Sequence, residues 1–138
     1  MGRLKYLLDT NICIHFIKNE SKVVHKVKEV GLENCYLSEM TLLELIYGIA
    51  NSQSVRKAEN NAKLREFEDM FIDRILSIRP SFEEYSSQKT RLRKLGTLIG
   101  DFDLLIGCTA LVNDFTLASR NVKEMNRIEG IKLENWID

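Results

Sequence analysis

Three carboxylates far apart in the chain stand where the sequence pattern changes from strand to helix. Asp9 directly follows an apolar run, Glu44 lies early in one helical pattern, and Asp103 lies in the first turn of another. Carboxylate oxygens are the ligands that Mg²⁺ and Mn²⁺ prefer. Unneutralised carboxylates about 4 Å apart repel by roughly 4 kcal/mol at an effective dielectric constant of 20. A cluster of these acids therefore favours either raised pKa values or a bound divalent cation, and the chemistry of such a cation would suit hydrolysis of a phosphodiester.

The elements that must position these acids alternate between short apolar runs and amphipathic patterns. Strands are predicted at residues 4–8, 35–37, 75–78, 116–119 and 131–136. Helices are predicted at 12–17, 22–30, after Ser38, at 51–73, 81–95 and 101–113, and briefly after Asn121. This alternation predicts the α/β class, as a three-layer α/β/α sandwich around a mainly parallel sheet of about five strands. Residues 1–138 are expected to form a single domain.

The ends of the predicted strands indicate where a site would lie. In open parallel sheets, ligands bind outside the carboxyl ends of the strands. Asp9 follows the first strand, and Ser119 and Asn121 follow the fourth. We therefore expect them at one edge of the sheet, together with Glu44 and Asp103. Taken singly, Asp9 could be only a helix cap, Asp103 a first-turn acid and Glu44 an exposed helix acid.

Local patterns also predict helix caps, buried faces and close contacts. Single residues expected to cap a helix N-terminus are Thr10 or Asn11, Ser38 and Asp101. Reciprocal capping pairs are expected for Ser81 with Glu84 and for Asn121 with Glu124. The residues expected on buried helix faces are Leu42, Leu45, Ile46 and Ile49, then Leu64, Phe67, Met70 and Phe71. Those expected to allow close helix packing are Gly48, Gly107 and Ala110.

Charge gives a further constraint on partners. The 20 basic and 20 acidic residues give a formal net charge of +0, which argues against a protein held on nucleic acid by bulk positive charge. A local basic rim is still compatible with this balance. The basic run of Lys89, Arg91, Arg93 and Lys94 is either such a rim or an ordinary solvated helix face.

The cysteine pattern bears on metal type and location. Cys13, Cys35 and Cys108 are far apart and form no Cys-x-x-Cys pair, which argues against a thiolate zinc site. Cys13 and His15 are two positions apart on a predicted helix and so face different directions. We expect reduced, buried cysteines in a cytoplasmic protein. The apolar run near the N-terminus is too short for a signal peptide or a membrane span.

Four stretches, in order along nearly the whole chain, carry a family resemblance. They are residues 7–11 (LLDTN), 38–45 (SEMTLLEL) with Gly48, 99–106 (IGDFDLLI) with Ala110, and 119–128 (SRNVKEMNRI), which runs into residues 130–136. In this order they resemble the PIN-domain ribonuclease family, and within it the VapC-type toxins of bacterial toxin–antitoxin pairs. Ser119 departs from the pattern, since threonine is common at its position, but no core carboxylate is lost.

The resemblance implies an endoribonuclease that depends on Mg²⁺ or Mn²⁺. Its acidic core would be Asp9, Glu44 and Asp103, in which Asp9 and Asp103 hold metal directly and Glu44 completes the cluster or orients water. The fourth position of the family falls either near Asn121 or on Glu124. The resemblance also implies that the substrate is RNA, with tRNA a candidate, that the chain forms a homodimer, and that an antitoxin places a basic side chain in the acidic pocket. No membrane association is expected.

Residues beside the acids are expected to support them or to contact RNA. By the resemblance, Thr10 and Asn11 would support Asp9 through hydrogen bonds, and Ser119 would support the same edge. Arg120 and Lys123 lie closest to the predicted pocket among the basic residues, and are candidates for contacts with the RNA backbone.

Two other functions compete with a ribonuclease. A phosphatase of the haloacid dehalogenase type also begins with a strand and an Asp, but it needs a second acid two residues later, where this chain has Asn11. A phospho-acceptor receiver domain needs an Asp after a central strand, but Ile78 is followed by Arg79 and Pro80. An inactive protein-binding scaffold would have lost core acids, and none is missing here.

Overall fold

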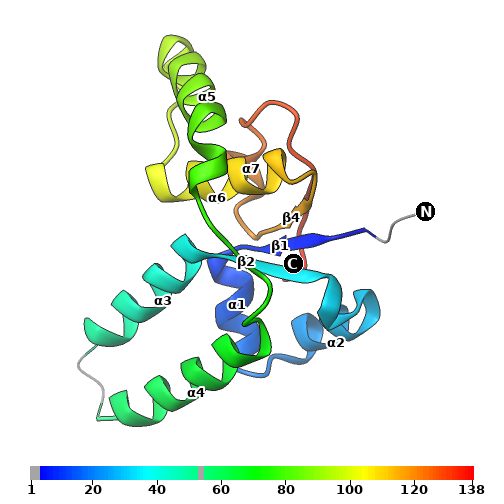
Figure 1. Cartoon of the computed structure of the whole chain (residues 1–138), viewed down its shortest axis with the longest axis vertical. Coiled ribbons are helices and arrows are strands. Elements are labelled where there is room, and N and C mark those ends of the chain that lie inside the picture. The colour runs from blue at the N-terminus through cyan, green and yellow to red at the C-terminus, as the bar shows by residue number, and fades with distance from the viewer. Residues whose placement is uncertain (1–3, 53–54) are drawn as a thin grey trace.

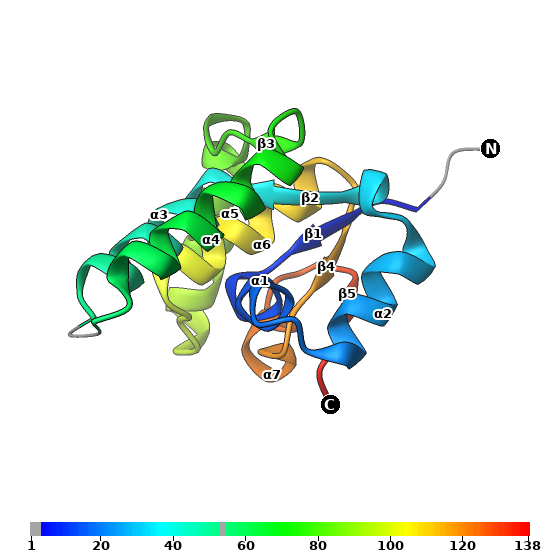
Figure 2. The same cartoon turned by 90° about the horizontal axis from the view of Figure 1, so that it is seen from below.

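The computed structural model describes residues 4–52 and 55–138. It contains an all-parallel sheet with the strand order β3-β2-β1-β4-β5. The strands are β1 (Tyr6–Leu8), β2 (Cys35–Ser38), β3 (Ile75–Leu76), β4 (Thr116–Ala118) and β5 (Leu133–Glu134). Figure 2 shows β1 between β2 and β4. The predicted fold class is confirmed.

Helices cover both faces of the sheet. They are α1 (Thr10–Ile17), α2 (Ser21–Val30), α3 (Glu39–Ala50), α4 (Lys57–Met70), α5 (Phe82–Leu95), α6 (Asp101–Val112) and α7 (Val122–Met125). Figure 1 shows α1, α2 and α4 below the strands and α5, α6 and α7 above them. In the same view α3 and α4 run side by side and project away from the sheet. Short 3₁₀ helices span Leu32–Asn34 and Arg79–Ser81.

The alternation of side chains along β1 creates the two halves of the core. Tyr6 and Leu8 point to the face covered by α1, α2 and α4, where they pack with Phe67 and Phe71. Leu7 points to the opposite face and packs with Leu104 and other side chains of that half. A strand buried on both faces requires apolar residues at successive positions, which explains why β1 reads as a continuous apolar run.

The two strands at the sheet edges are shorter than predicted. β3 and β5 contain two residues each, where the sequence predicted 75–78 and 131–136. The residues after each strand make local hydrogen bonds instead of continuing the sheet. The Ser81 N–H donates to the Ile78 carbonyl, and the Asn135 side chain accepts from the Ile137 and Asp138 N–H groups. The predicted helix at 51–73 is also wrong at its start, because α3 continues to Ala50 and α4 begins at Lys57.

Most of the predicted helix caps differ from the observed ones. Ser38 caps α3 as predicted, because its Oγ accepts from the Met40 N–H at 3.1 Å. The cap of α1 is Asp9, since its carboxylate accepts from the Thr10 N–H and the helix begins at Thr10 itself. Asp101 lies inside α6 and pairs with Lys89 at 2.7 Å instead of capping.

The capping pairs are both wrong. Ser81 donates its hydroxyl proton to the Ile78 carbonyl at 2.6 Å, and Glu84 accepts from Gln88. Asn121 stands at the cap position of α7 but makes no side-chain capping bond. In each pair the expected capping residue bonds to a group outside its own helix. Ser81 bonds to the preceding Ile78, and Asn121 bonds to Asp103 of α6.

The small residues on α3 and α6 behave differently from each other. A Cβ on Gly107 would lie 2.3 Å from Ile128 Cδ1, so the predicted close packing of α6 is confirmed. Beyond its chain neighbours and the nearby backbone of α3, a Cβ on Gly48 would meet no described atom within 4 Å, so the close packing predicted at that position is wrong. Ile46 and Met70, both predicted inward, are 52% and 45% exposed. The outer face of α3 is therefore open and apolar.

Candidate active site

The strand order brings the carboxyl ends of β1 and β4 together at one edge of the sheet, which is the crevice position of open α/β folds. The chain passes from β1 to β2 and β3 on one side, and later adds β4 and β5 on the other. Such a point, where the direction of winding reverses, is where open α/β sheets bind their ligands. Leu8 pairs with Ala118, so the next residues, Asp9 and Ser119, lie beside each other at this crevice.

Asp9 is buried and held by two donors. Its Oδ1 accepts from the Thr10 N–H at 2.8 Å, and its Oδ2 accepts from Ser119 Oγ at 2.7 Å. Ser119 Oγ in turn accepts from the Asn121 N–H at 2.9 Å. Burial raises the pKa of Asp9 and the charge of Glu44 adds to that rise, while the bonds from Ser119 and Thr10 and the side chain of Asn11 oppose it. The donors fix the direction of the carboxylate.

Asp103 reaches the same crevice from the first turn of α6. Burial and, in decreasing order, the negative charges of Asp9, Glu44 and Glu124 together raise its pKa to about 6. Asn121 Nδ2 donates to Asp103 Oδ2 at 3.4 Å. The four acids named from the sequence are thus near enough to interact electrostatically at one edge of the sheet.

Glu44 enters the site from α3 and is held by α1. Thr10 Oγ1 donates to Glu44 Oε1 at 2.6 Å, and it also lies 3.2 Å from Thr41 Oγ1. The Thr10 backbone supports Asp9 while its side chain supports Glu44. Sequence reasoning missed Thr41; the available signal was its position one turn before Glu44 on the same helix face.

The acids fit a hydrated divalent cation. In residues 4–52 and 55–138, no three His, Cys, Asp or Glu side chains are arranged to hold one ion directly. Mg²⁺ usually keeps several waters and is bound through one or two carboxylates. A raised pKa of Asp103 among acids of like charge is the electrostatic situation that a cation relieves. Asp9, Asp103 and Glu44 are the acids of this edge that could hold such an ion.

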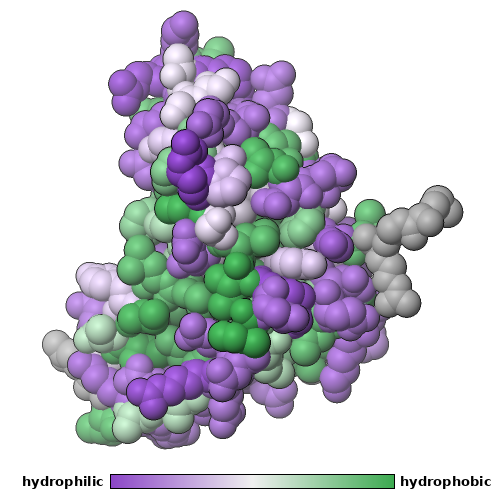
Figure 3. All heavy atoms as spheres, in the orientation of Figure 1, coloured by the Kyte–Doolittle hydropathy of each residue, from purple (hydrophilic) through white to green (hydrophobic). Residues whose placement is uncertain are grey.

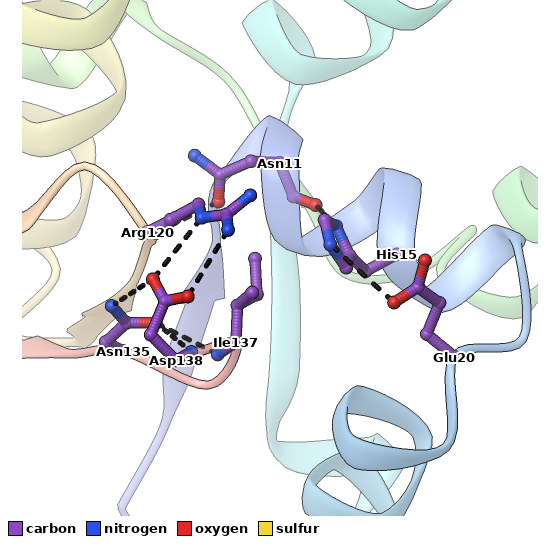
Figure 4. Close-up of polar contacts among 7 residues, drawn as sticks. All are labelled: Asn11, His15, Glu20, Arg120, Asn135, Ile137 and Asp138. Atoms are coloured by element: carbon purple, nitrogen blue, oxygen red, sulfur yellow. Dashed lines mark hydrogen bonds and ion pairs between the residues drawn. The ribbon is translucent and has the colours of Figure 1, made fainter.

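The predicted RNA contacts have different surroundings. Figure 4 shows Arg120 next to Asn11, whose Oδ1 accepts from the Arg120 N–H at 3.1 Å. The Arg120 guanidinium donates to the Asp138 carboxylate through Nε and Nη2, both at 3.3 Å. Lys123 is exposed on α7. Asp138 was not singled out from the sequence, and no local pattern could have linked it to Arg120.

Two of the four residues in the basic run on α5, Lys89 and Arg91, are engaged within the chain. Lys89 pairs with Asp101, and Arg91 donates to the Arg127 carbonyl at 2.6 Å and pairs with Glu129 at 3.4 Å. These bonds fasten α5 to α6 and to the segment after α7. They favour a structural role for Lys89 and Arg91 over an RNA-binding rim.

The other polar candidates are structural. The three cysteines are free and buried, as predicted. His15 faces Glu20, with a ring nitrogen 2.9 Å from the Asn11 carbonyl oxygen (Figure 4). None of the helices in the described residues has the length and apolar character needed to cross a membrane.

The fold and the acidic crevice define the class of protein. The model of the PIN domain family matches residues 6–131, and the chain belongs to that family. Ribonuclease VapC2 of Rickettsia felis is 36% identical over 137 residues, which cover 95% of this chain and 97% of the relative. The tRNA(fMet)-specific endonuclease VapC of Shigella flexneri is 32% identical over 136 residues, which cover 96% and 98%.

The solved structures narrow the class further. The structure of VapBC2 from Rickettsia felis bound to a DNA fragment from its promoter superposes with a TM-score of 0.87 at 32% identity, covering 96% of this chain and 99% of that one. VapBC-1 from nontypeable Haemophilus influenzae gives a TM-score of 0.77 at 31% identity, covering 98% and 100%. Within the PIN domain family, this chain is a VapC-type ribonuclease.

Proposed function

We propose that this chain is the toxin of a toxin–antitoxin pair and cuts RNA, with tRNA as its substrate, by using Mg²⁺ or Mn²⁺ held by Asp9 and Asp103. The observation that carries the proposal is the meeting of Asp9, Glu44, Asp103 and Glu124 at the crevice between β1 and β4. The tRNA substrate is favoured by relatives that are named tRNA(fMet)-specific endonucleases. A cytoplasmic location follows from such a substrate.

Each side chain of the site has a proposed role. The bound cation would supply the positive charge that activates water and offsets the charge of the phosphate. Ser119 keeps Asp9 oriented, and Asn121 orients Asp103 by its amide. Glu44 completes the cluster or orients the attacking water, and Glu124 is the fourth acid.

We assign contacts with the RNA backbone to Arg120 and Lys123, the two basic residues beside the crevice. Arg120 is fixed by Asn11 and Asp138 at the end of β4, and Lys123 lies one residue before Glu124 on the chain. Their charges would attract phosphates close to a site that is otherwise acidic. An Arg120→Ala variant that binds RNA with the salt dependence of the wild type would refute this contact.

The main experiment measures cleavage of purified initiator tRNA and of an unrelated structured RNA. We expect cleavage of the tRNA with Mg²⁺ or Mn²⁺ and none with a chelator. Asp9→Asn should lower the rate by roughly 10²–10⁴-fold, because several kcal/mol of transition-state stabilisation depend on the cation. Glu20→Gln is the matched control, since Glu20 is exposed and remote from the crevice. Full activity of Asp9→Asn would refute the proposal, and equal cleavage of both RNAs would refute the tRNA assignment.

The antitoxin partner is supported by an apolar groove that leads to the acids. The groove has a volume of about 350 Å³ and borders Glu44. Its apolar lining includes Ile14, Ile17, Leu45, Ile49 and Leu64. Figure 3 shows apolar surface gathered over this region between α3, α1 and α4. In a second arm of the same assay, the small protein encoded beside the toxin gene should co-purify with the chain and stop cleavage; an active co-purified complex would contradict this assignment.

The homodimer is supported by the open outer face of α3. Leu43, Ile46 and Tyr47 are 48%, 52% and 64% exposed. Phe102 of α6 lines a pocket together with Leu43, Glu44 and Tyr47. Exposed apolar side chains gathered on one face are typical of interaction surfaces.

Sedimentation should therefore give a dimer for the wild type and a monomer for Ile46→Lys, because a buried unpaired ammonium opposes association. Leu4→Lys, which changes another exposed apolar residue, 64% exposed and near the N-terminus, is the control and should remain dimeric. A wild-type monomer at the same concentration would rule out this state.

A further inference from the structure

The hydroxyl of Thr10 joins two helices at the acidic crevice. Thr10 is the first residue of α1, and its Oγ1 lies 2.6 Å from Glu44 Oε1 and 3.2 Å from Thr41 Oγ1. Glu44 and Thr41 stand one turn apart on α3, so both face α1. Thr41 is fully buried, while Thr10 and Glu44 are half-buried. The contact therefore lies between the core and the open crevice.

The number of protons available decides which groups donate in the contacts among Thr41, Thr10 and Glu44. A hydroxyl has one proton to donate, and a carboxylate has none. The short contact with Glu44 takes the Thr10 proton, in the distance range of a charge-assisted bond. The Thr41 hydroxyl must then donate to Thr10. The three side chains form a one-way chain of hydrogen bonds, from Thr41 through Thr10 to Glu44.

These hydrogen bonds hold the side chain of Glu44, which would otherwise leave the site. Glu44 has several rotatable bonds, and the charges of Asp9 and Asp103 repel its carboxylate. Without a bond at Oε1, the side chain would relax toward solvent on the open face of α3. With the bond at Oε1, Oε2 has no protein partner in the part of the chain that the structure describes. One oxygen is therefore anchored and the other is available.

We propose that Thr10 is a positioning residue that presents Glu44 to the divalent cation, and that Thr41 orients Thr10 for this purpose. The inference rests on the proposed cation site and adds two residues that act through Glu44. Thr10 already donates its backbone N–H to Asp9, so a single residue aligns two acids of the site. A purely structural tie between α1 and α3 would stabilise the fold without affecting the affinity for the cation.

The test measures Mn²⁺ affinity in the absence of RNA, by electron paramagnetic resonance or calorimetry. Thr10→Val removes the hydroxyl and keeps the shape, and should weaken Mn²⁺ binding about 10-fold, as loss of a ligand-orienting partner typically does. Thr10→Ser restores the hydroxyl and should bind within about 2-fold of the wild type by the same argument. Thr90→Val is the matched control, because the exposed Thr90 hydroxyl donates to the Ser86 carbonyl within α5, away from the acids.

Each outcome decides between explanations. Wild-type Mn²⁺ affinity in Thr10→Val would overturn the positioning role, as would a folded Thr10→Ser protein that binds as weakly as Thr10→Val. If Thr10→Val fails to fold, Thr41→Val replaces it: weaker Mn²⁺ binding supports the inference, and unchanged binding overturns it. Absence of Mn²⁺ binding by the wild type would overturn the proposed cation site itself, which is a different result.

Discussion

Asp103→Asn should melt at a higher temperature than the wild type when no divalent cation is present, and should have almost no activity on RNA. The folded pKa of Asp103 is about 6, above the value of about 3.9 for an unfolded Asp. A raised acid pKa stabilises the fold below pH 4 or so, and that contribution is lost as the pH rises through the folded pKa. At neutral pH the charged carboxylate is therefore a destabilising group, and the neutral amide removes its repulsion.

The expected size of this effect is moderate because Asp103 is only half-buried. Each pKa unit corresponds to about 1.36 kcal/mol, and discounting for solvent screening leaves about 1 kcal/mol at pH 7.5. The melting temperature should rise by roughly 3–5 °C at that pH and change little at pH 4. The loss of a cation-holding carboxylate should lower cleavage by roughly 10²–10⁴-fold. Thermal melts with chelator and cleavage assays with Mn²⁺ measure the two effects.

Asp101→Asn is the control for this prediction. Asp101 lies two residues away on the same helix but is exposed, and bonds from Lys89 and Tyr85 lower its pKa. Removing its charge should therefore give no gain in stability and leave cleavage near the wild-type rate. A lower melting temperature of Asp103→Asn at pH 7.5 would show that repulsion among the acids is not its main interaction.

Leu8→Ala should give the largest loss of stability. Leu8 is fully buried, directly precedes Asp9, and lies in the strand at the centre of the sheet. Truncating a buried leucine removes transfer free energy and leaves a cavity, which costs about 2–5 kcal/mol. The midpoint of urea unfolding should fall accordingly, with the slope of the transition unchanged.

Leu4→Ala provides the comparison for Leu8. Leu4 is 64% exposed, so its truncation should change the free energy of unfolding by at most about 0.5 kcal/mol. An assay of RNA cleavage by Leu8→Ala well below its melting temperature separates two effects, the loss of folded protein and the loss of catalytic activity. A cost below about 1 kcal/mol for Leu8→Ala would mean that the surroundings of β1 collapse around the smaller side chain.

The distribution of apolar residues alone predicted the arrangement of strands and helices. β1 and β4 are buried along their whole length, β1 as a continuous apolar run, and the polar residues that follow them, Asp9 and Ser119, mark their ends. Because parallel strands align their carboxyl ends, Asp9 and Ser119 could be expected at one edge from the chain order alone. The roles given to Glu44, Asp103 and Glu124 came from the family resemblance, since a lone helix acid has no distinctive local pattern.

Interactions between distant segments were decided only by the tertiary structure. The bond from Ser119 to Asp9 needs the register of β1 with β4, and the bond from Thr10 to Glu44 needs the packing of α1 on α3. The predicted capping roles of Asp101 and Asn121 were wrong because Lys89 and Asp103 offered them partners from elsewhere in the chain. Sequence patterns reflect the interactions of a residue with neighbours within a helical turn or along a strand. They do not record which remote side chain comes within hydrogen-bond distance, because that depends on the packing of the whole sheet and its helices.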